Sequence, residues 1–192
     1  MERVKNAVIF HGSGDGPSSY WIPYMRQGLE LKGYQVRTPQ LPNDSERLGL
    51  DLWLPEALKA PDVNTRLLIA HSAGVPLALS VLESLKDVTI NQVILVAGFC
   101  SPRELDEWCD ERNPILQASY DWDAIRARVG QVICLNSDDD PYTCDDRKGQ
   151  EIVNLIGSDK ARLIVMKGQG HMGSDFFQQP YKEFPFLLSL VG

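Results

Sequence analysis

The stretch LLIAHSAGVPLAL (residues 67–79) joins two different hydrophobic patterns without a gap. Its first four residues form a continuous apolar run of strand length, which is typical of a strand buried on both faces of a parallel sheet. Leu77, Val81 and Leu85 then recur at the four-residue spacing of a helix face. Pro76 falls in the first turn of that helix, where the missing N–H is tolerated. The stretch therefore predicts a buried strand, a sharp turn at Ser72, and a helix over residues 73–85.

The same alternation continues on both sides of this stretch. Further apolar runs, each ending at glycine or polar residues, predict strands at residues 7–10, 93–97, 132–135 and 163–166, with a weaker one at 34–38. The stretches between them predict helices from residue 18 or 19 to 31, over 45–58 with a bend or interruption before Pro55, over 145–156, and over 181–190 with a break or late start at Pro185. This order predicts an α/β fold, a three-layer α/β/α sandwich with a mainly parallel sheet.

The chain is expected to be one domain over residues 1–192, with no linker or internal repeat. Residues 99–128 are too long for an ordinary connection, so we expect a short lid-like excursion over the carboxyl edge of the sheet. The net charge is −7 and no basic stripe is visible, which argues against a nucleic-acid partner and an anionic membrane surface. The longest apolar runs are of strand size, so no membrane span is expected. A monomer in the cytoplasm is the expectation.

The four cysteines form no CxxC pair, and the histidines lie far from them in sequence. A zinc site usually shows tighter ligand spacing, so neither a metal nor an organic cofactor is expected. The cysteines are interpreted as buried or incidental thiols in a reducing compartment.

Candidate chemistry lies just after each predicted strand, because ligands of open α/β sheets bind at the carboxyl ends of the strands. Ser72 lies in a strand-to-helix turn with small residues two before and two after it, although Ala70 stands where glycine is usual. A serine nucleophile needs a base and an orienting carboxylate. His171 follows the last predicted strand, and an aspartate loop follows the strand before it. The chain order of nucleophile, acid and base is that of one large class of hydrolases.

Three consecutive aspartates could supply the acid. Asp140, directly before Pro141, is preferred because the acid falls at this place on the loop in related folds. Asp139 is the reserve, and Asp138 is interpreted as a turn former. His71, beside Ser72, is expected to face away from the site.

The glycine loop after the first strand predicts an oxyanion site. Backbone N–H groups of Ser13 and Ala73 are the expected donors, with Gly12 as the fallback. A dinucleotide site is disfavoured because the spacing is G-x-G-x-G rather than G-x-G-x-x-G. Three aromatic residues in segments expected above the catalytic edge are candidate walls of a substrate pocket: Trp108, Trp122 and Tyr142.

These residues together give a family resemblance. Residues 10–13 (FHGS), 21–24 (WIPY) and 41–42 (LP), followed by the blocks at 70–74, 137–142 and 170–171, resemble the retinoblastoma-binding protein nine family of small serine hydrolases. The resemblance covers almost the whole chain and implies a minimal α/β-hydrolase fold with a triad of Ser72, Asp140 and His171. Thr143 and Cys144 depart from the apolar residue and proline expected after the acid. The Leu-x-Cys-x-Glu pattern that binds the animal family's protein partner is absent, so that partner is not expected.

The sequence thus predicts a serine hydrolase that cleaves carboxylic ester, thioester or amide bonds of small acyl substrates through an acyl-enzyme intermediate. The alternative is a catalytically silent binding or scaffold protein on a hydrolase fold, since fold alone does not fix function. A hydrolase of peptides or lactones is a third hypothesis.

Overall fold

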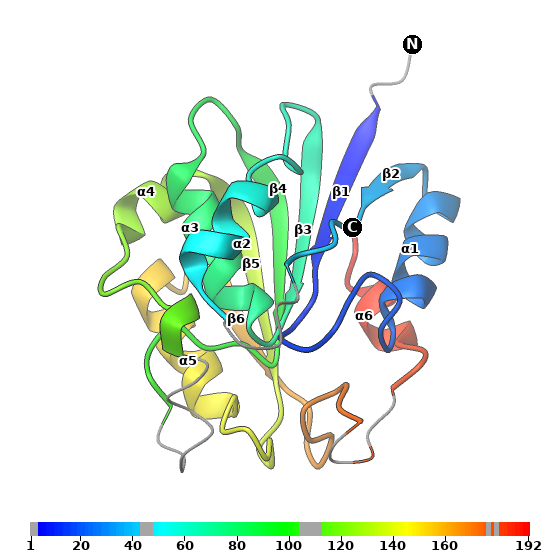
Figure 1. Ribbon diagram of the computed structural model, residues 1–192, viewed down its shortest axis with the longest axis vertical. Coiled ribbons are helices and arrows are strands. Elements are labelled where there is room, and N and C mark those ends of the chain that lie inside the picture. Colours follow the sequence, from blue (N-terminus) through cyan, green and yellow to red (C-terminus); the bar gives the residue numbers. More distant parts are fainter. Residues whose placement is uncertain (1–3, 43–47, 104–112, 176–177, 179–180) are drawn as a thin grey trace.

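The computed structural model describes residues 4–42, 48–103, 113–175, 178 and 181–192. Its centre is a six-stranded sheet in the order β2-β1-β3-β4-β5-β6, in which all neighbouring strands are parallel (Figure 1). The strands are β1 (Lys5–Phe10), β2 (Tyr34–Arg37), β3 (Thr65–His71), β4 (Ile90–Val96), β5 (Val129–Asn136) and β6 (Ala161–Val165). Each of the six predicted strands is present, and the predicted parallel sheet is confirmed.

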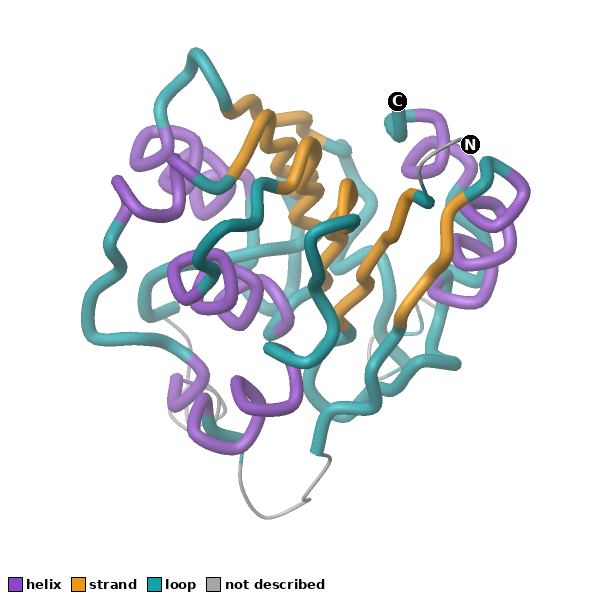
Figure 2. Tube along the Cα trace, turned by 90° about the horizontal axis from the view of Figure 1, so that it is seen from above, coloured by secondary structure: helices purple, strands orange, loops and turns teal. Residues whose placement is uncertain are grey.

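Helices cover both faces of this sheet. Helices α1 (Ile22–Leu31) and α6 (Pro185–Ser189) pack together on one face. The other face carries α2 (Leu50–Ala57), α3 (Gly74–Ser84), α4 (Trp122–Ala127) and α5 (Asp146–Ile156), each in contact with the next. Figure 2 shows the strands between the two helical layers. The predicted three-layer sandwich is therefore confirmed. No helix in the described part of the chain is long and apolar enough to cross a membrane.

The centre of the core is the strand–turn–helix unit that begins at residue 67. The β3 residues 67–70 are fully buried, and β3 pairs with β1 and β4 on its two sides. Helix α3 is buried around most of its circumference, from Gly74 to Leu82. The continuous apolar run therefore places the end of β3 at the centre of the core, with Ser72 directly after it.

Two proline positions show how packing modifies the predicted helices. Helix α6 starts late, at Pro185, as predicted. The interruption predicted before Pro55 is wrong, because α2 continues through Pro55 to Ala57, and the alternative of a bend stays a prediction. Pro55 costs this short helix one backbone hydrogen bond near its end, while Trp53 and Ala57 are buried in the core. Burial of these two side chains offsets that loss.

The predicted excursion at residues 99–128 is described only in part. Residues 104–112 lie outside the described residues, and the rest contains a short 3₁₀ turn (Asn113–Ile115) and α4. Helix α4 packs beside α3 and α5 in the helical layer. A lid therefore stays a prediction for the segment before residue 113.

Candidate active site

Ser72 occupies the turn between β3 and α3 in a left-handed backbone conformation, with φ of 52°. A side chain in this region is strained, and such strain persists only where the surrounding structure enforces it. The N–H of Ser72 donates to the carbonyl of Val96 at the end of β4, at 3.0 Å. Helix α3 then begins at Gly74, so its first N–H groups lie beside the serine.

Two glycines allow other backbone segments to approach this turn closely. A Cβ on Gly74 would lie 2.6 Å from the carbonyl oxygen of His11, so α3 can begin against the end of β1 only without a side chain there. A Cβ on Gly12 would lie 3.1 Å from Cβ of Ser72. The loop after β1 is thus in contact with the serine turn.

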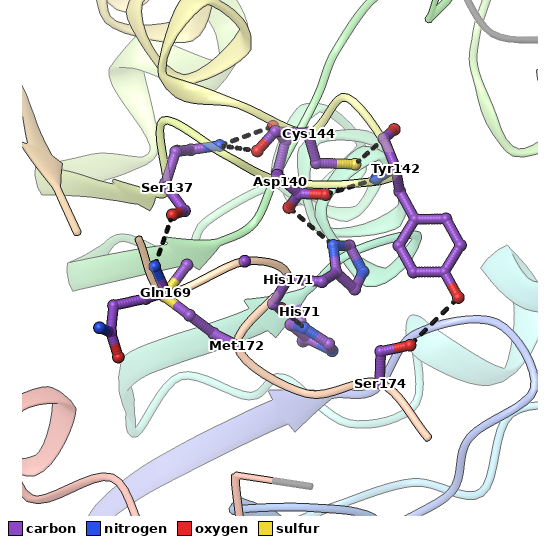
Figure 3. A network of polar contacts seen from close by, with 12 residues as sticks. His71, Ser137, Asp140, Tyr142, Cys144, Gln169, His171, Met172 and Ser174 are labelled. Atoms are coloured by element: carbon purple, nitrogen blue, oxygen red, sulfur yellow. Dashed lines mark hydrogen bonds and ion pairs between the residues drawn. The ribbon is translucent and has the colours of Figure 1, made fainter. Parts of the chain in front are cut away.

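Asp140 and His171 are joined by a buried hydrogen bond. His171 Nδ1 lies 2.7 Å from Asp140 Oδ2, and the two residues are 4 % and 6 % exposed. Figure 3 shows the two side chains pointing toward one another. The other carboxylate oxygen, Oδ1, accepts the N–H of Tyr142 at 2.8 Å. In the neutral ring this arrangement places the proton on Nδ1 and the lone pair on Nε2, as a general base requires.

The neighbouring aspartates bind the backbone of the same histidine loop. Asp138 Oδ1 accepts the N–H of Gly168 at 2.9 Å, and Asp139 Oδ1 accepts the N–H of Gly170 at 2.8 Å. The carboxylate of Asp140 is the one that reaches the His171 ring. Hydrogen bonds from Ser137 and Gly170 lower the pKa of Asp139. Each of the three aspartates therefore has a partner in residues 168–171, and the sequence analysis missed the partners of Asp138 and Asp139.

Ser137 completes this attachment between the two loops, which we call the acid–base clamp (residues 137–140 and 166–171). Its hydroxyl accepts the N–H of Gln169 at 3.0 Å and lies 2.7 Å from the carbonyl oxygen of Met166. The bonds of the clamp fix the backbone directly before Asp140 and directly before His171. Such preorganised positioning is what catalysis by an acid–base pair needs.

The prediction that His71 faces away from the site is wrong. The rings of His71 and His171 lie 5.0 Å apart between centroids, and His71 Nε2 lies 3.0 Å from the carbonyl oxygen of His171. Burial lowers the pKa of His71 to about 3, and the neighbouring His171 ring adds to the shift. His71 is therefore neutral at physiological pH and donates its Nε2 proton. Trp21 Nε1 donates to the next carbonyl, that of Met172, at 2.9 Å.

Comparisons with known proteins identify the family. A family model described as serine hydrolase matches residues 7–189. The chain belongs to this serine hydrolase family. No curated protein matches the sequence.

Solved structures extend the comparison to the fold. The ydeN gene product of B. subtilis shares 23 % identity, with a TM-score of 0.84 over 98 % of this chain and 97 % of that one. Est1E from Butyrivibrio proteoclasticus, solved with ferulic acid bound, shares 17 % identity, with a TM-score of 0.68 over 98 % and 90 %. Mouse alpha/beta hydrolase domain-containing protein 10 shares 10 %, with a TM-score of 0.71 over 97 % and 87 %.

These structures confirm the minimal α/β-hydrolase fold that the sequence predicts. The resemblance is thereby confirmed at the level of small serine hydrolases. The finer likeness to the retinoblastoma-binding protein nine family stays a prediction.

The candidate pocket residues of this serine hydrolase lie in different places. The Tyr142 ring packs edge-on against His171 at 4.6 Å between centroids, and its hydroxyl lies 3.1 Å from Ser174 Oγ (Figure 3). Trp122 begins α4 and packs against Tyr120 at 5.4 Å. Figure 1 shows α4 far from the carboxyl ends of the strands, so the structure does not bring Trp122 to the cluster. Trp108 lies outside the described residues.

In this serine hydrolase, His11 binds the loop after β2 and has no role in the acid–base pair. Its Nδ1 lies 2.8 Å from the carbonyl oxygen of Gly12, and its Nε2 accepts the N–H of Leu41 at 3.1 Å. Burial lowers the pKa of His11, so the ring is neutral and can make both bonds at once.

Proposed function

We propose that this hydrolase cleaves carboxylic esters of small molecules, and chemically related thioesters or amides, through a Ser72–Asp140–His171 triad. The buried Asp140–His171 hydrogen bond beside the strained turn of Ser72 is the observation that carries the proposal. Ser72 directly follows His71, whose ring packs on His171, so nucleophile and base belong to one contact network.

In the proposed mechanism, His171 Nε2 accepts the Ser72 hydroxyl proton while Oγ attacks the acyl carbon. Asp140 keeps the Nδ1 tautomer and stabilises the imidazolium that forms. The histidine then gives its proton to the leaving alcohol, thiol or amine, which leaves an acyl group on Ser72. In the second half of the reaction, His171 takes a proton from a water molecule that attacks the acyl group. The histidine then returns the proton to Ser72 Oγ as the carboxylic acid leaves.

The oxyanion of the tetrahedral intermediate is assigned to the backbone N–H groups of Ser13 and Ala73, with Gly12 as the fallback. Neither the Ser13 nor the Ala73 N–H has a hydrogen-bond partner among the described residues. The contact of Gly12 with Ser72 supports a donor from this loop, and Ala73 lies at the positive N-terminal end of α3. Donors held in this way stabilise developing negative charge without reorganisation.

Fluorophosphonate labelling with peptide mapping tests the proposal, because only an activated serine reacts. We expect one adduct, at Ser72, that is lost in Ser72→Ala and His171→Ala. Ser189→Ala, an exposed serine on α6, serves as the matched control and should label like the wild type.

A folded wild-type protein that does not label would overturn this mechanism and favour the silent binding protein. Unlabelled wild-type protein from the same preparation is then assayed with a panel of short-chain esters, thioesters, amides, lactones and peptides. Preferred turnover of lactones or peptides would replace the substrate class proposed above.

We further propose that the chain acts as a monomer in the cytoplasm, on a small acyl substrate, with no nucleic-acid or membrane partner. The absence of disulfides at Cys100, Cys134 and Cys144, three of the described residues, supports a reducing compartment. Size-exclusion chromatography with light scattering would test the oligomeric state, and a mass of two chains would contradict it.

A further inference from the structure

A cysteine lies within the acid–base site that the mechanism does not use. Cys144 comes four positions after Asp140, on the loop between β5 and α5, and is completely buried. One ligand atom from each of Asp140, Cys144 and His171 lies within 4.8 Å of the others. Sequence spacing argued against a metal site because the histidines are distant from the cysteines in the chain. The fold removes that distance.

Arg103 gives this cysteine an unusual environment. Arg103 is 5 % exposed, and its guanidinium lies over the Phe99 ring, at 4.2 Å from the centroid. Arg103 Nη1 lies 3.5 Å from Cys144 Sγ and 3.3 Å from the carbonyl oxygen of Tyr142. A positive charge beside a thiol favours the thiolate, which is the form that binds metals. An N–H directed at a sulfur ligand also fixes its orientation.

We propose that Asp140, Cys144 and His171 form an inhibitory site for a thiophilic divalent cation such as Zn²⁺. Carboxylate oxygen, thiolate sulfur and imidazole nitrogen are the donors that Zn²⁺ takes in proteins, at about 2.0–2.3 Å. Two of the donors are anionic when bound, so the set neutralises the dication. Adjacent ligand atoms of a tetrahedral site lie about 3.5 Å apart. Asp140 Oδ2 and His171 Nδ1, now 2.7 Å apart, must therefore separate slightly as the metal replaces the proton between them, and separations of up to 4.8 Å elsewhere in the cluster must shorten.

The protons are accounted for at each ligand. The Cys144 thiol releases its proton to solvent as the thiolate binds. His171 Nδ1 faces Asp140 and exchanges its proton for the metal, so the neutral ring carries the proton on Nε2 instead. This consequence rests on the proposed function: a ring protonated at Nε2 cannot accept the Ser72 proton, and hydrolysis stops.

Metal binding is tested first, independently of activity. Co²⁺ serves as a spectroscopic probe, because a thiolate ligand gives it a charge-transfer band in the near ultraviolet. We expect one Co²⁺ or Zn²⁺ per chain, measured by absorption and calorimetry, and no binding of Mg²⁺, which prefers oxygen ligands.

Cys144→Ser should lose the band and bind Zn²⁺ at least about 100-fold more weakly, since even outer partners of a metal site contribute 10–100-fold. Cys100→Ser is the matched control, because Cys100 is also buried but lies beside Glu151 and Lys148 rather than in the cluster. Cys144→Ala, with thermal melting of each variant, separates loss of the ligand from loss of the fold. Unchanged Zn²⁺ affinity in folded Cys144 variants, or no binding by the wild type, would overturn the proposal.

The second arm measures fluorophosphonate labelling with and without Zn²⁺, each variant against its own metal-free rate. Zn²⁺ should suppress labelling of the wild type and Cys100→Ser, and not of Cys144→Ser. A protein that binds one Zn²⁺ through Cys144 yet never labels would retain the metal site and refute the hydrolase mechanism. Labelling that is insensitive to bound Zn²⁺ would refute inhibition while leaving the mechanism intact.

Discussion

Asp139 accepts the backbone N–H of Gly170 at 2.8 Å, so the residue before the proposed acid binds the residue before the proposed base. Asp138 makes the equivalent bond to Gly168 two positions earlier. The distance between Asp140 and His171 is therefore set by the backbone contacts of the residues just before each of them, and not by their own hydrogen bond alone.

Asp139→Ala should lower kcat about tenfold with little change in KM. Loss of one such hydrogen bond to a charged group is worth about 1.5 kcal/mol, and the loop it holds positions the base. The kcat of Asp139→Asn should lie between those of the wild type and Asp139→Ala, because an amide oxygen still accepts the Gly170 N–H. Steady-state kinetics with an ester substrate measures both. Asp123→Ala, which removes an exposed carboxylate on α4, is the control, and equal rates in all three variants would refute the positioning role.

The strain at Ser72 predicts a stability difference between two inactive variants. Ser72→Gly should be about 0.5–1 kcal/mol more stable than Ser72→Ala, because glycine adopts a positive φ without the steric cost of a Cβ. Urea unfolding of both proteins gives the difference. A result in which alanine is equal or better would mean that the turn is unstrained.

The buried neutral His71 predicts how stability depends on pH. Its pKa is lowered from 6.5 to about 3 by burial, so below pH 6.5 the unfolded chain binds a proton that the folded chain does not. Keeping His71 neutral therefore costs no stability above pH 6.5. As the pH falls from 6.5 toward 3, the free energy of unfolding decreases by up to about 1.4 kcal/mol per pH unit.

His71→Gln should flatten that dependence, because glutamine can keep an N–H donor for the His171 carbonyl and does not titrate. His71→Leu should flatten it as well but also lower the labelling rate, since the carbonyl then loses its donor. Unfolding free energies at pH 7 and pH 5 test this, and an equal fall in the wild type and both variants would contradict it.

Gly74 and Gly28 offer a comparison of backbone and side-chain crowding. Gly74→Ala should destabilise the protein by about 2 kcal/mol or more, because the new Cβ meets the backbone oxygens of His11 and Phe10 at 2.6 and 2.9 Å. Gly28→Ala meets the end of the flexible Leu188 side chain, which can move, and alanine favours the α1 helix. Thermal unfolding should separate the two variants clearly, and similar losses would refute this distinction.

Continuous apolar runs were sufficient to predict five of the six strands, and burial on both faces makes the four central ones the clearest. The place of Ser72 followed from the same local pattern. The edge strand β2, in which partly buried and exposed residues alternate, was predicted only as a weaker strand. Three features did not follow from local pattern, because each depends on where a distant loop lies. They are the direction of His71, the partners of Asp138 and Asp139, and the proximity of Cys144 to His171. Pro55 was mispredicted for a related reason, as the buried Trp53 and Ala57 stabilise α2 in a way that local propensity does not contain.

The bonds of the acid–base clamp span about 30 residues of chain, whereas His71 and His171 are 100 positions apart and Trp21 and Met172 are 151 apart. Loop closure costs more entropy as the closed loop lengthens. On refolding, Asp140 and His171 can come into contact as soon as β5, α5 and β6 assemble. Bringing this pair next to Ser72 requires the whole sheet. Recovery of serine labelling should therefore lag behind recovery of helical and sheet structure. The rate at which labelling recovers would then report the rate of the last long-range contact to form.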